Sequence, residues 1–397
     1  MTLSASQRSL VWSYVLFGAT IGFAWFVIAP LIPAILGGFK VSLGSALLLI
    51  SLYGYAMVIL SVPSALRART SGPAGLLQLA ALISFVGLAL RALAPSYPIM
   101  LLGQAIAAVA YPMTISPIGT VLRAARVAKP KTATGLAIGL LFLGMSLGAL
   151  LGPSLAASLG FHGTLWVMAA VNGLFGLNLA RNAKTFAFDP PNPGAASGPL
   201  LVWSRWWVVG FAIASLSVMV GSITAPAIGH LGVVNAIAVA GFLTAMTFLG
   251  SAVGAVGFGY LGDLISNPDL LEKALAVLTW LVLLVVTLIL TGRTGHSLGL
   301  LDIAFFLFGA LGNGWYALAL DRAATRATNA GQSGMATAGY STASNLGVAL
   351  IPALLGPLVL SSPGQWMTTT LAIMAVAVAA TFWARQSAAS PSDLRAS

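Results

Sequence analysis

No aspartate or glutamate occurs between Met1 and Phe188, and the same stretch contains at least six apolar runs long enough to span a membrane. Over the whole chain of 397 residues, 59% of the residues are hydrophobic and only 6% are charged. A soluble protein needs a polar surface and typically carries about a quarter charged residues. The sequence therefore predicts a chain whose surface lies mostly in lipid rather than in water.

Twelve apolar runs, bounded by glycine, proline or charged residues, approach the length that a helix needs to cross a bilayer, about 20 residues. This pattern predicts an all-α integral membrane protein with twelve transmembrane helices. The runs are 10–36, 43–66, 73–92, 98–122, 133–159, 164–180, 205–229, 235–261, 273–291, 298–320, 333–359 and 364–384.

The stretch between the sixth and seventh runs has the composition of a linker. It contains the sequence Pro190-Pro191-Asn192-Pro193-Gly194, and segments rich in proline and glycine typically connect domains. The linker divides the chain into halves of nearly equal length. We therefore expect an N-terminal six-helix bundle at 1–181, a cytoplasmic linker at 182–204, a C-terminal six-helix bundle at 205–386 and a cytoplasmic tail at 387–397.

The basic residues indicate how the chain is oriented. With a cytoplasmic N-terminus, all 18 Lys and Arg residues except Lys40, Arg91 and Arg293 fall on cytoplasmic segments, in agreement with the positive-inside rule. We expect a multi-pass protein of the plasma membrane with both termini in the cytoplasm. The net charge of +11 then reflects topology. Because no basic cluster stands beside a soluble domain, we expect no nucleic-acid partner.

Short matches between the two halves suggest an internal repeat. They occur in the same order in both halves, and several have offsets of about 200 residues. The pairs are Leu10-Val11-Trp12-Ser13 with Leu201-Val202-Trp203-Ser204, Ala29-Pro30 with Ala225-Pro226, Ser146-Leu147-Gly148 with Asn345-Leu346-Gly347, and Trp166 with Trp366. Parallel repeats of this kind are found in transporters, where the binding site lies between the halves near the membrane midplane.

The six-plus-six plan, the cytoplasmic N-terminus and the central linker resemble the major facilitator superfamily over almost the whole chain. This resemblance implies two pseudo-symmetric six-helix bundles and a monomer in the lipid bilayer. It also implies that a small-molecule substrate is carried by alternating access around a cavity between the bundles.

A superfamily motif, Gly-x-x-x-Asp-Arg-x-Gly-Arg, follows the second and eighth helices and is partly present here. Gly259 and Asp263 match it after the eighth run, but Leu264 replaces the arginine. After the second run, Arg69 stands where the acid is usual. If Arg69 and Asp263 are equivalent in position, the gating contacts between helices are rearranged. The alternative is that Arg67 and Arg69 only mark the cytoplasmic side.

Gly139, Gly148, Gly152 and Pro153 resemble the fifth-helix motif of the superfamily's drug–proton antiporters. Small residues at such spacings also let helices approach closely without any further role, so both interpretations stay open. Gln104 argues against antiport, because many proton-coupled members carry an arginine at the corresponding place in the fourth helix.

Polar and aromatic residues near the middle of the cavity-lining helices are the candidates for substrate binding. A polar side chain in a membrane needs a partner or a cavity, because lipid cannot satisfy it. The candidates are Trp25, Tyr55, Gln104, Tyr111, Thr114, Ser217, Asn313, Tyr316 and Asn345. The alternative for the aromatic residues is packing or an interfacial position. For Asn313 and Asn345 it is a hydrogen bond between helices.

Asp302 is the only acid that falls clearly inside an apolar run, and it is the candidate proton site. Its alternative role is an ion pair with Arg293 or Arg91 at the outer surface. The sequence offers no clustered nucleophile, base or metal ligands, and it has no cysteine. We therefore expect no catalytic residue, no metal site, no cofactor and no enzymatic activity.

The function that this pattern favours is transport of a small organic solute, as a uniporter or as a proton-coupled carrier. A neutral or cationic solute is expected, because no basic residue is predicted at mid-depth in the membrane and aromatic faces attract cations. Two alternatives stay open. One is a drug/proton antiporter that works in efflux, and the other is a receptor-like or structural membrane protein that does not transport.

Overall fold

The structure is a computed structural model that describes residues 5–41, 43–184, 205–234, 236–293, 298–325 and 330–383. Within these ranges the regular secondary structure is entirely helical. The helices are α1 (Ala5–Phe26), α2 (Ile28–Phe39), α3 (Leu43–Ser71), α4 (Pro73–Leu93), α5 (Tyr97–Ile115), α6 (Ile118–Ala124), α7 (Pro130–Ala183), α8 (Trp206–His230), α9 (Ala236–Leu264), α10 (Pro268–Leu290), α11 (Leu298–Thr325), α12 (Ala330–Leu355), α13 (Leu358–Ser361) and α14 (Pro363–Phe382).

Nine helices in the described ranges are long and apolar enough to cross a membrane. One of them is α7, which has 54 residues. A further apolar stretch in α8, Trp206–Gly221, is shorter. The expected all-α membrane protein is therefore confirmed, while the number of twelve spans stays a prediction.

Proline and glycine explain where several helices begin and bend. Pro73, Pro130, Pro268 and Pro363 are each the first residue of a helix, a position where the missing N–H group of proline costs nothing. Within α7, Gly160 has φ 71° and ψ 178°, a conformation that only glycine adopts readily. This break joins two helical segments, which correspond to the predicted spans 133–159 and 164–180.

Three of the predicted spans are each formed by two helices in sequence. Span 10–36 consists of α1 and α2, span 98–122 of α5 and α6, and span 333–359 of α12 and α13. Pro117 lies between α5 and α6, and Pro357 lies between α12 and α13. A proline lacks the N–H group and interrupts a continuous helix.

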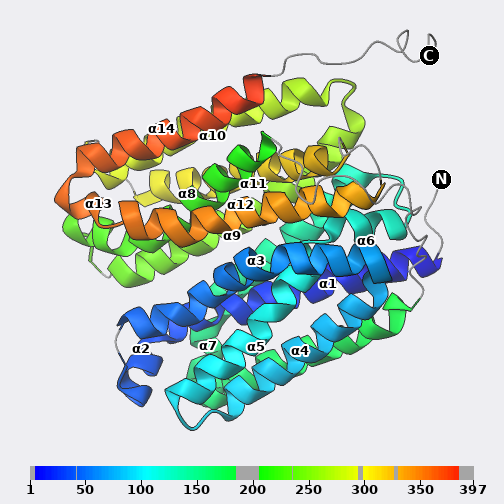
Figure 1. The fold of residues 1–397 in the computed structure, drawn as a ribbon. Helices are drawn as coiled ribbons and strands as arrows, with labels where there is room; N and C mark the ends of the chain where they lie inside the picture. Colours follow the sequence, from blue (N-terminus) through cyan, green and yellow to red (C-terminus); the bar gives the residue numbers. More distant parts are fainter. Residues whose placement is uncertain are drawn as a thin grey trace.

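The helices of each half of the chain pack mainly on one another. In Figure 1, α1 to α7 lie in the lower part of the view and α8 to α14 in the upper part, with α7 packed against α9 and α3 against α12 between them. The start of α1 and the end of α14 lie at the same end of the molecule. The domain limits 1–181, 182–204, 205–386 and 387–397 stay predictions, and residues 185–204 and 384–397 lie outside the described ranges.

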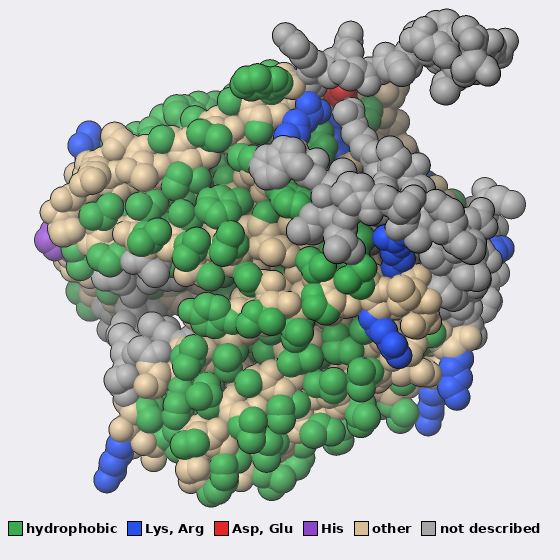
Figure 2. Space-filling view, viewed as in Figure 1, with side chains coloured by type: hydrophobic (Ala, Val, Ile, Leu, Met, Phe, Trp, Pro, Cys, Tyr) green, Lys and Arg blue, Asp and Glu red, His purple; other side chains and the backbone are tan. Residues whose placement is uncertain are grey.

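The outward faces of the helices are covered by apolar side chains, and the basic side chains in view lie toward the two ends of the molecule (Figure 2). Large exposed apolar residues occur on α3, α4, α7 and α14, among them Ile59, Leu82, Leu174 and Val376. Such extended apolar surface is rare on soluble monomers and is the surface that a bilayer requires. The chain is therefore a multi-pass membrane protein.

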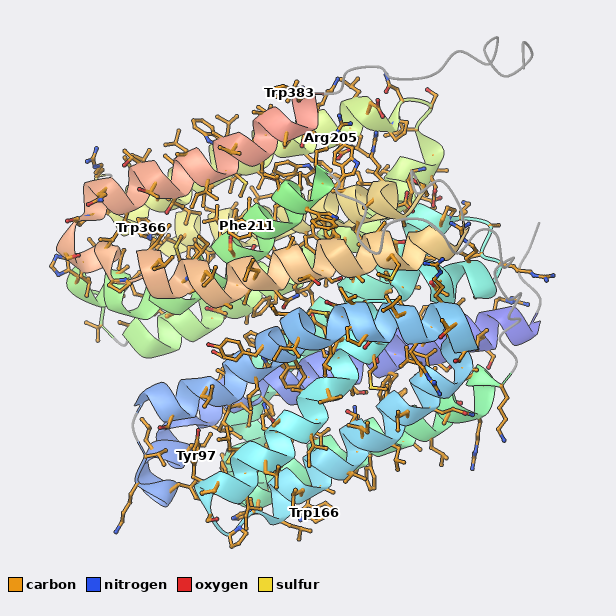
Figure 3. All side chains as sticks on the ribbon, viewed as in Figure 1. Tyr97, Trp166, Arg205, Phe211, Trp366 and Trp383 are labelled. Carbon is orange, nitrogen blue, oxygen red and sulfur yellow. The ribbon has the colours of Figure 1, made fainter. Side chains whose placement is uncertain are left out.

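The matched tryptophans of the two halves differ in their surroundings. Trp166 is 41% exposed and lies on the periphery of the helix bundle, whereas Trp366 is fully buried (Figure 3). Trp383, near the end of the described chain, is 76% exposed (Figure 3). The short sequence matches therefore do not extend to equal side-chain environments at every position.

Candidate functional site

Three aromatic side chains from α1, α3 and α5 form a compact group inside the first half of the chain. The rings of Trp25 and Tyr53 are stacked, with centroids 4.7 Å apart and an interplanar angle of 9°. The ring of Tyr111 lies 5.2 Å from that of Trp25 and 6.0 Å from that of Tyr53. The indole N–H of Trp25 donates a hydrogen bond of 2.8 Å to the carbonyl of Ile50. All three side chains are buried.

The second half of the chain continues this group from α11 and α12. The Tyr111 hydroxyl lies near the Asn345 side chain and within electrostatic range of Tyr316. The rings of Tyr316 and Tyr340 meet edge to face, with centroids 4.9 Å apart. We call Trp25, Tyr53, Tyr111, Tyr316, Tyr340 and Asn345 the central aromatic cluster. It brings four predicted binding residues together across the contact between the halves.

Tyr55, another predicted binding residue, lies apart from this cluster. It is 44% exposed, whereas Tyr53 is 1% exposed. A helix turns by about 100° per residue, so two positions along the chain point in nearly opposite directions. The buried face of α3 contains Tyr53, Met57 and Ser61 at intervals of four residues. This periodicity is the signal in the sequence that identifies Tyr53.

Gln104, another predicted binding residue, is fully buried, and both polar atoms of its side-chain amide form hydrogen bonds. Its Nε2 donates to the carbonyl of Leu49 at 2.8 Å, and its Oε1 accepts from Nη1 of Arg91 at 2.6 Å. The same Nη1 donates to the carbonyl of Ala24 at 3.0 Å. Arg91 was expected at the outer surface, but it is fully buried beside a predicted binding residue. Arg91 is thus a basic residue in direct contact with a predicted binding residue.

The contact between the halves also contains a polar junction at the start of α7. The Asp263 carboxylate of α9 accepts hydrogen bonds from the backbone N–H of Thr132 at 2.8 Å and from its hydroxyl at 2.5 Å. Lys131 lies 3.7 Å from the other carboxylate oxygen. Further along the contact, Ser61 and Thr342 share a hydrogen bond of 2.5 Å. These bonds join α7 to α9 and α3 to α12.

Comparison with known proteins addresses the fold. No protein-family model and no curated protein matches the sequence. Among solved structures, one similar protein is the human organic anion transporter MFSD10 (TETRAN). The alignment covers 94% of this chain and 99% of the MFSD10 chain, with 15% sequence identity and a TM-score of 0.70. The major facilitator superfamily transporter FucP, in the outward conformation, matches 94% and 100%, with the same identity and TM-score. The chain has the major facilitator fold. The resemblance drawn from the sequence is confirmed at the level of fold.

The glycines of the fifth-helix motif lie at close helix contacts of this major facilitator fold. A Cβ atom added at Gly139 would lie 2.6 Å from Cγ2 of Val256, and one added at Gly148 would lie 2.7 Å from the carbonyl oxygen of Phe23. The first contact joins α7 to α9, and the second joins α7 to α1. Gly152 is buried and Pro153 is exposed. The glycines therefore serve close packing, whether or not the chain is also related to the antiporters.

Arg69 and Asp263, the two residues aligned with the superfamily loop motif, have different surroundings. Arg69 is buried at the end of α3, and among the residues that the structure describes it makes no ion pair. Asp263 has the partners on α7 named above. Gly259 also faces α7, because a Cβ atom there would lie 2.8 Å from the carbonyl oxygen of Lys131. The two loop positions are thus not equivalent in their contacts.

Three further predicted binding residues are buried outside the central aromatic cluster. Thr114 donates to the carbonyl of Ala110 at 2.8 Å, within its own helix. Asn313 donates to the hydroxyl of Ser251 at 2.7 Å, which is a hydrogen bond between α11 and α9. The Ser217 hydroxyl has no hydrogen-bond partner in the described ranges. The contact of Asn313 is the interhelical alternative stated for it.

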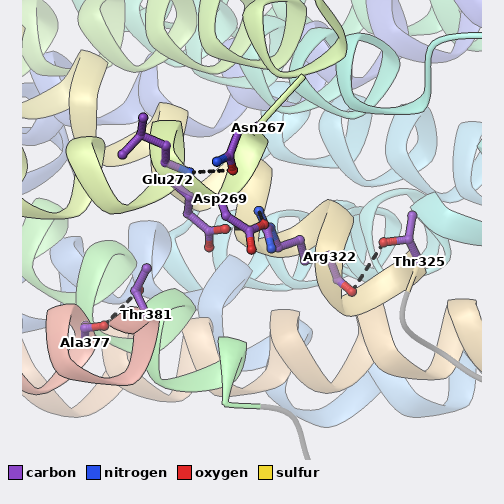
Figure 4. A network of polar contacts seen from close by, with 8 residues as sticks. Asn267, Asp269, Glu272, Arg322, Thr325, Ala377 and Thr381 are labelled. Atoms are coloured by element: carbon purple, nitrogen blue, oxygen red, sulfur yellow. Dashed lines mark hydrogen bonds and ion pairs between the residues drawn. The ribbon is translucent and has the colours of Figure 1, made fainter. Parts of the chain in front are cut away.

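Acids of α10 and α11 lie at opposite ends of α11. Asp302 is partly buried near the start of α11 and, within the described residues, has no ion pair with Arg293 or Arg91. Near the other end of α11, Arg322 binds both Asp269 and Glu272 of α10 (Figure 4), with 2.5 Å to Glu272. This second group ties α10 to α11 and is structural.

No group of three metal-binding side chains occurs in the part of the chain that the structure describes. His162 and His230 lie on different helices, and the ring nitrogen Nδ1 of His162 lies 2.9 Å from the carbonyl oxygen of Ala92. His296 lies outside the described residues. The central aromatic cluster is therefore the site that the arrangement favours.

Proposed function

We propose that the protein is a secondary transporter that carries a small organic solute across a membrane by alternating access. The observation that carries this proposal is the central aromatic cluster, in which Tyr111 of one half meets Asn345 and Tyr316 of the other. A site shared by two rocking halves can be opened to either side in turn. The major facilitator fold supports the same mechanism.

The cluster suits a small organic solute. It combines aromatic faces with an amide and hydroxyl groups, and its members are buried. Binding sites for small molecules are typically apolar and contain a few polar groups that fix the orientation of the ligand. In this proposal Trp25, Tyr53, Tyr111 and Tyr316 provide the surface, and Asn345 provides the polar anchor.

The contacts between the halves suggest which side is closed. The polar contact of Asp263 with Thr132 lies at the end where α7 begins and α9 ends. This is the end that the positive-inside rule assigns to the cytoplasm. We propose that the cytoplasmic side is closed in this state.

The same proposal includes a monomer in the plasma membrane with both termini in the cytoplasm, and two bundles that move relative to each other. The proposal allows two modes of energy coupling. The carrier is either a uniporter or is driven by protons through Asp302, and drug/proton antiport remains the alternative for an exporter. Gln104 disfavours antiport, because it cannot supply a positive charge itself.

A flux measurement distinguishes transport from a receptor-like role. Compounds are first screened by thermal stabilisation of the purified protein, since a ligand that binds the folded state raises the unfolding temperature. The best compound is then tested for exchange across the membrane of proteoliposomes. Exchange above that of empty liposomes supports transport. Stabilisation without exchange supports the receptor-like alternative.

A further inference from the structure

Arg91 carries a charge that nothing in its half of the chain neutralises. It is fully buried in α4, and the sequence contains no Asp or Glu before Asp189. Its Nη1 donates to the neutral oxygens of Gln104 and Ala24. A buried ion is costly unless it is both paired and hydrogen-bonded, so these two neutral acceptors compensate the guanidinium only in part.

The atoms of Arg91 that lack partners lie on one edge of the guanidinium. Nε and Nη2 are buried and have no hydrogen-bond partner among the described residues. Together they form the pair of parallel donors that binds the two oxygens of a carboxylate. The free edge therefore matches a planar, singly charged anion, and the charge of such an anion would balance that of Arg91.

Arg91 also adjoins the central aromatic cluster. The Tyr53 hydroxyl lies within electrostatic range of the Arg91 guanidinium, and the Tyr53 ring is stacked on Trp25 at 4.7 Å. Gln104, which holds Nη1, links the same guanidinium to the carbonyl of Leu49 on α3. A single positive charge thus lies next to a set of apolar ring faces, and none of the residues that Arg91 contacts by these interactions is basic.

We propose that the transported solute is a small organic monoanion whose carboxylate pairs with the Nε–Nη2 edge of Arg91 and whose apolar part lies against Trp25, Tyr53 and Tyr111. This inference rests on the proposed transport function and gives its substrate class. It replaces the expectation of a neutral or cationic solute, because a cation beside Arg91 would be repelled. Since Arg91 is enclosed in this state, the anion enters when the helices around it move.

The test uses the purified full-length protein and matched probes. Acetate, lactate, benzoate and phenylacetate are each compared with the corresponding primary amide, and sodium chloride and choline chloride serve as ionic controls. The readout is the unfolding temperature, followed by the dissociation constant from a titration. At least one carboxylate is expected to stabilise the protein while its amide does not. An amide that binds as tightly as its carboxylate would overturn the proposal.

Two variants assign the binding to Arg91. Arg91→Gln is expected to weaken binding of the stabilising carboxylate by roughly 30-fold or more, the loss typical when one member of a buried charge pair is removed. Arg91→Lys keeps the charge without the planar edge and is expected to bind more weakly than the wild type. Lys40→Gln removes an exposed charge from the same half and is expected to bind normally. Unchanged carboxylate binding by Arg91→Gln overturns the proposal.

The remaining outcomes separate this inference from the transport proposal. Stabilisation by chloride but by none of the carboxylates overturns the organic-anion site, since a structural ion then fills the edge. If Arg91→Gln does not yield a folded protein, the comparison of carboxylate with amide on the wild type decides. Carboxylate binding without exchange in proteoliposomes supports the anion site and contradicts transport. Exchange of a neutral solute that is unaffected in Arg91→Gln supports transport and contradicts the anion site.

Discussion

The Asp263 carboxylate of α9 holds Thr132 of α7 by both its backbone N–H and its hydroxyl, at 2.8 Å and 2.5 Å. Thr132 lies in the first turn of α7, which begins at Pro130. The first N–H groups of a helix lack partners within the helix and favour a negative charge. Asp263 therefore caps a helix of one half from a helix of the other, and it stabilises the state in which these ends meet.

We expect Asp263→Ala to loosen this end of the contact between the halves. Hydrogen bonds to a charged group contribute about 1.5–3 kcal/mol each, and every 1.4 kcal/mol changes a population about tenfold. The chain has no cysteine, so Ala65→Cys places a single label in the α3–α12 contact, where Ala65 is fully buried. Its reaction with a water-soluble maleimide should become at least about tenfold faster in the Asp263→Ala background.

The control for this variant is Asp269→Ala. Asp269 binds Arg322 within the second half, so its loss should leave the labelling rate of Ala65→Cys unchanged. Equal rates in the Asp263→Ala and the unmodified backgrounds would show that Asp263 does not hold the halves together.

Substitution of Gly135 should destabilise the protein. A Cβ atom added there would collide with the carbonyl oxygen of Ala255 and would lie 3.4 Å from Cα of Gly259, so α7 and α9 would have to separate. Overpacking of this kind typically costs about 1–3 kcal/mol. Gly135→Ala should therefore lower the unfolding temperature in detergent. Gly257→Ala, where an added Cβ meets nothing within 4 Å, should not lower it.

Tyr53 and Tyr55 form a matched pair for testing the central aromatic cluster. Tyr53 is stacked on Trp25, whereas Tyr55 is exposed on the opposite face of α3. We expect Tyr53→Ala and Trp25→Ala to reduce solute exchange in proteoliposomes strongly, while Tyr55→Ala retains it. Protein yield and monodispersity should be measured for all three. Normal exchange by Tyr53→Ala and Trp25→Ala together would place the binding site elsewhere.

The fold could be predicted from the sequence to a considerable extent, because a bilayer permits few arrangements. A lipid-exposed backbone must satisfy its own polar groups, which leaves helices for apolar runs of this length. The apolar runs therefore located the helices well, as in the run 73–92, which forms α4 at Pro73–Leu93. The breaks at Val27 and Pro117 were not predicted. Apolarity continues through these residues, so hydropathy gives no sign of a break. Pro117 departs from helical angles, with φ −86° and ψ 18°, whereas Val27 keeps them.

The candidate site could be predicted only in part, because hydropathy does not specify which way a side chain points. Four of the nine proposed residues, Trp25, Tyr111, Tyr316 and Asn345, meet in the central aromatic cluster. Tyr53 was missed since it lies two residues from the more conspicuous choice. Arg91 was assigned to the outer surface because charge near the end of an apolar run usually marks a membrane boundary. Its burial depends on contacts with Gln104, 13 residues away on the next helix, and with Ala24, 67 residues away on α1.

Labelling of single cysteines tests the orientation. Ala128 and His162 are both exposed. Ala128 lies just before α7, and His162 lies just after the break of α7 at Gly160. We expect a cysteine at position 128 to react with an impermeant maleimide only from the cytoplasmic side, and a cysteine at 162 only from outside. The reverse pattern would invert the assignment of both termini and of the closed side.

Asp302→Asn tests the coupling. Asparagine has nearly the shape of aspartate but cannot bind a proton, so it removes proton transport and leaves the packing of α11 intact. We expect Asp302→Asn to exchange solute across the membrane of proteoliposomes as fast as the wild type. We also expect it to lose any accumulation that a pH gradient drives in the wild type. Ser215→Ala removes a buried hydroxyl of α8 that bonds only within its own helix; it is the control and should keep accumulation. If the wild type only equilibrates the solute at every pH gradient, the protein is a uniporter and Asp302 has no part in coupling. If Asp302→Asn still accumulates solute, the proton is carried by another group.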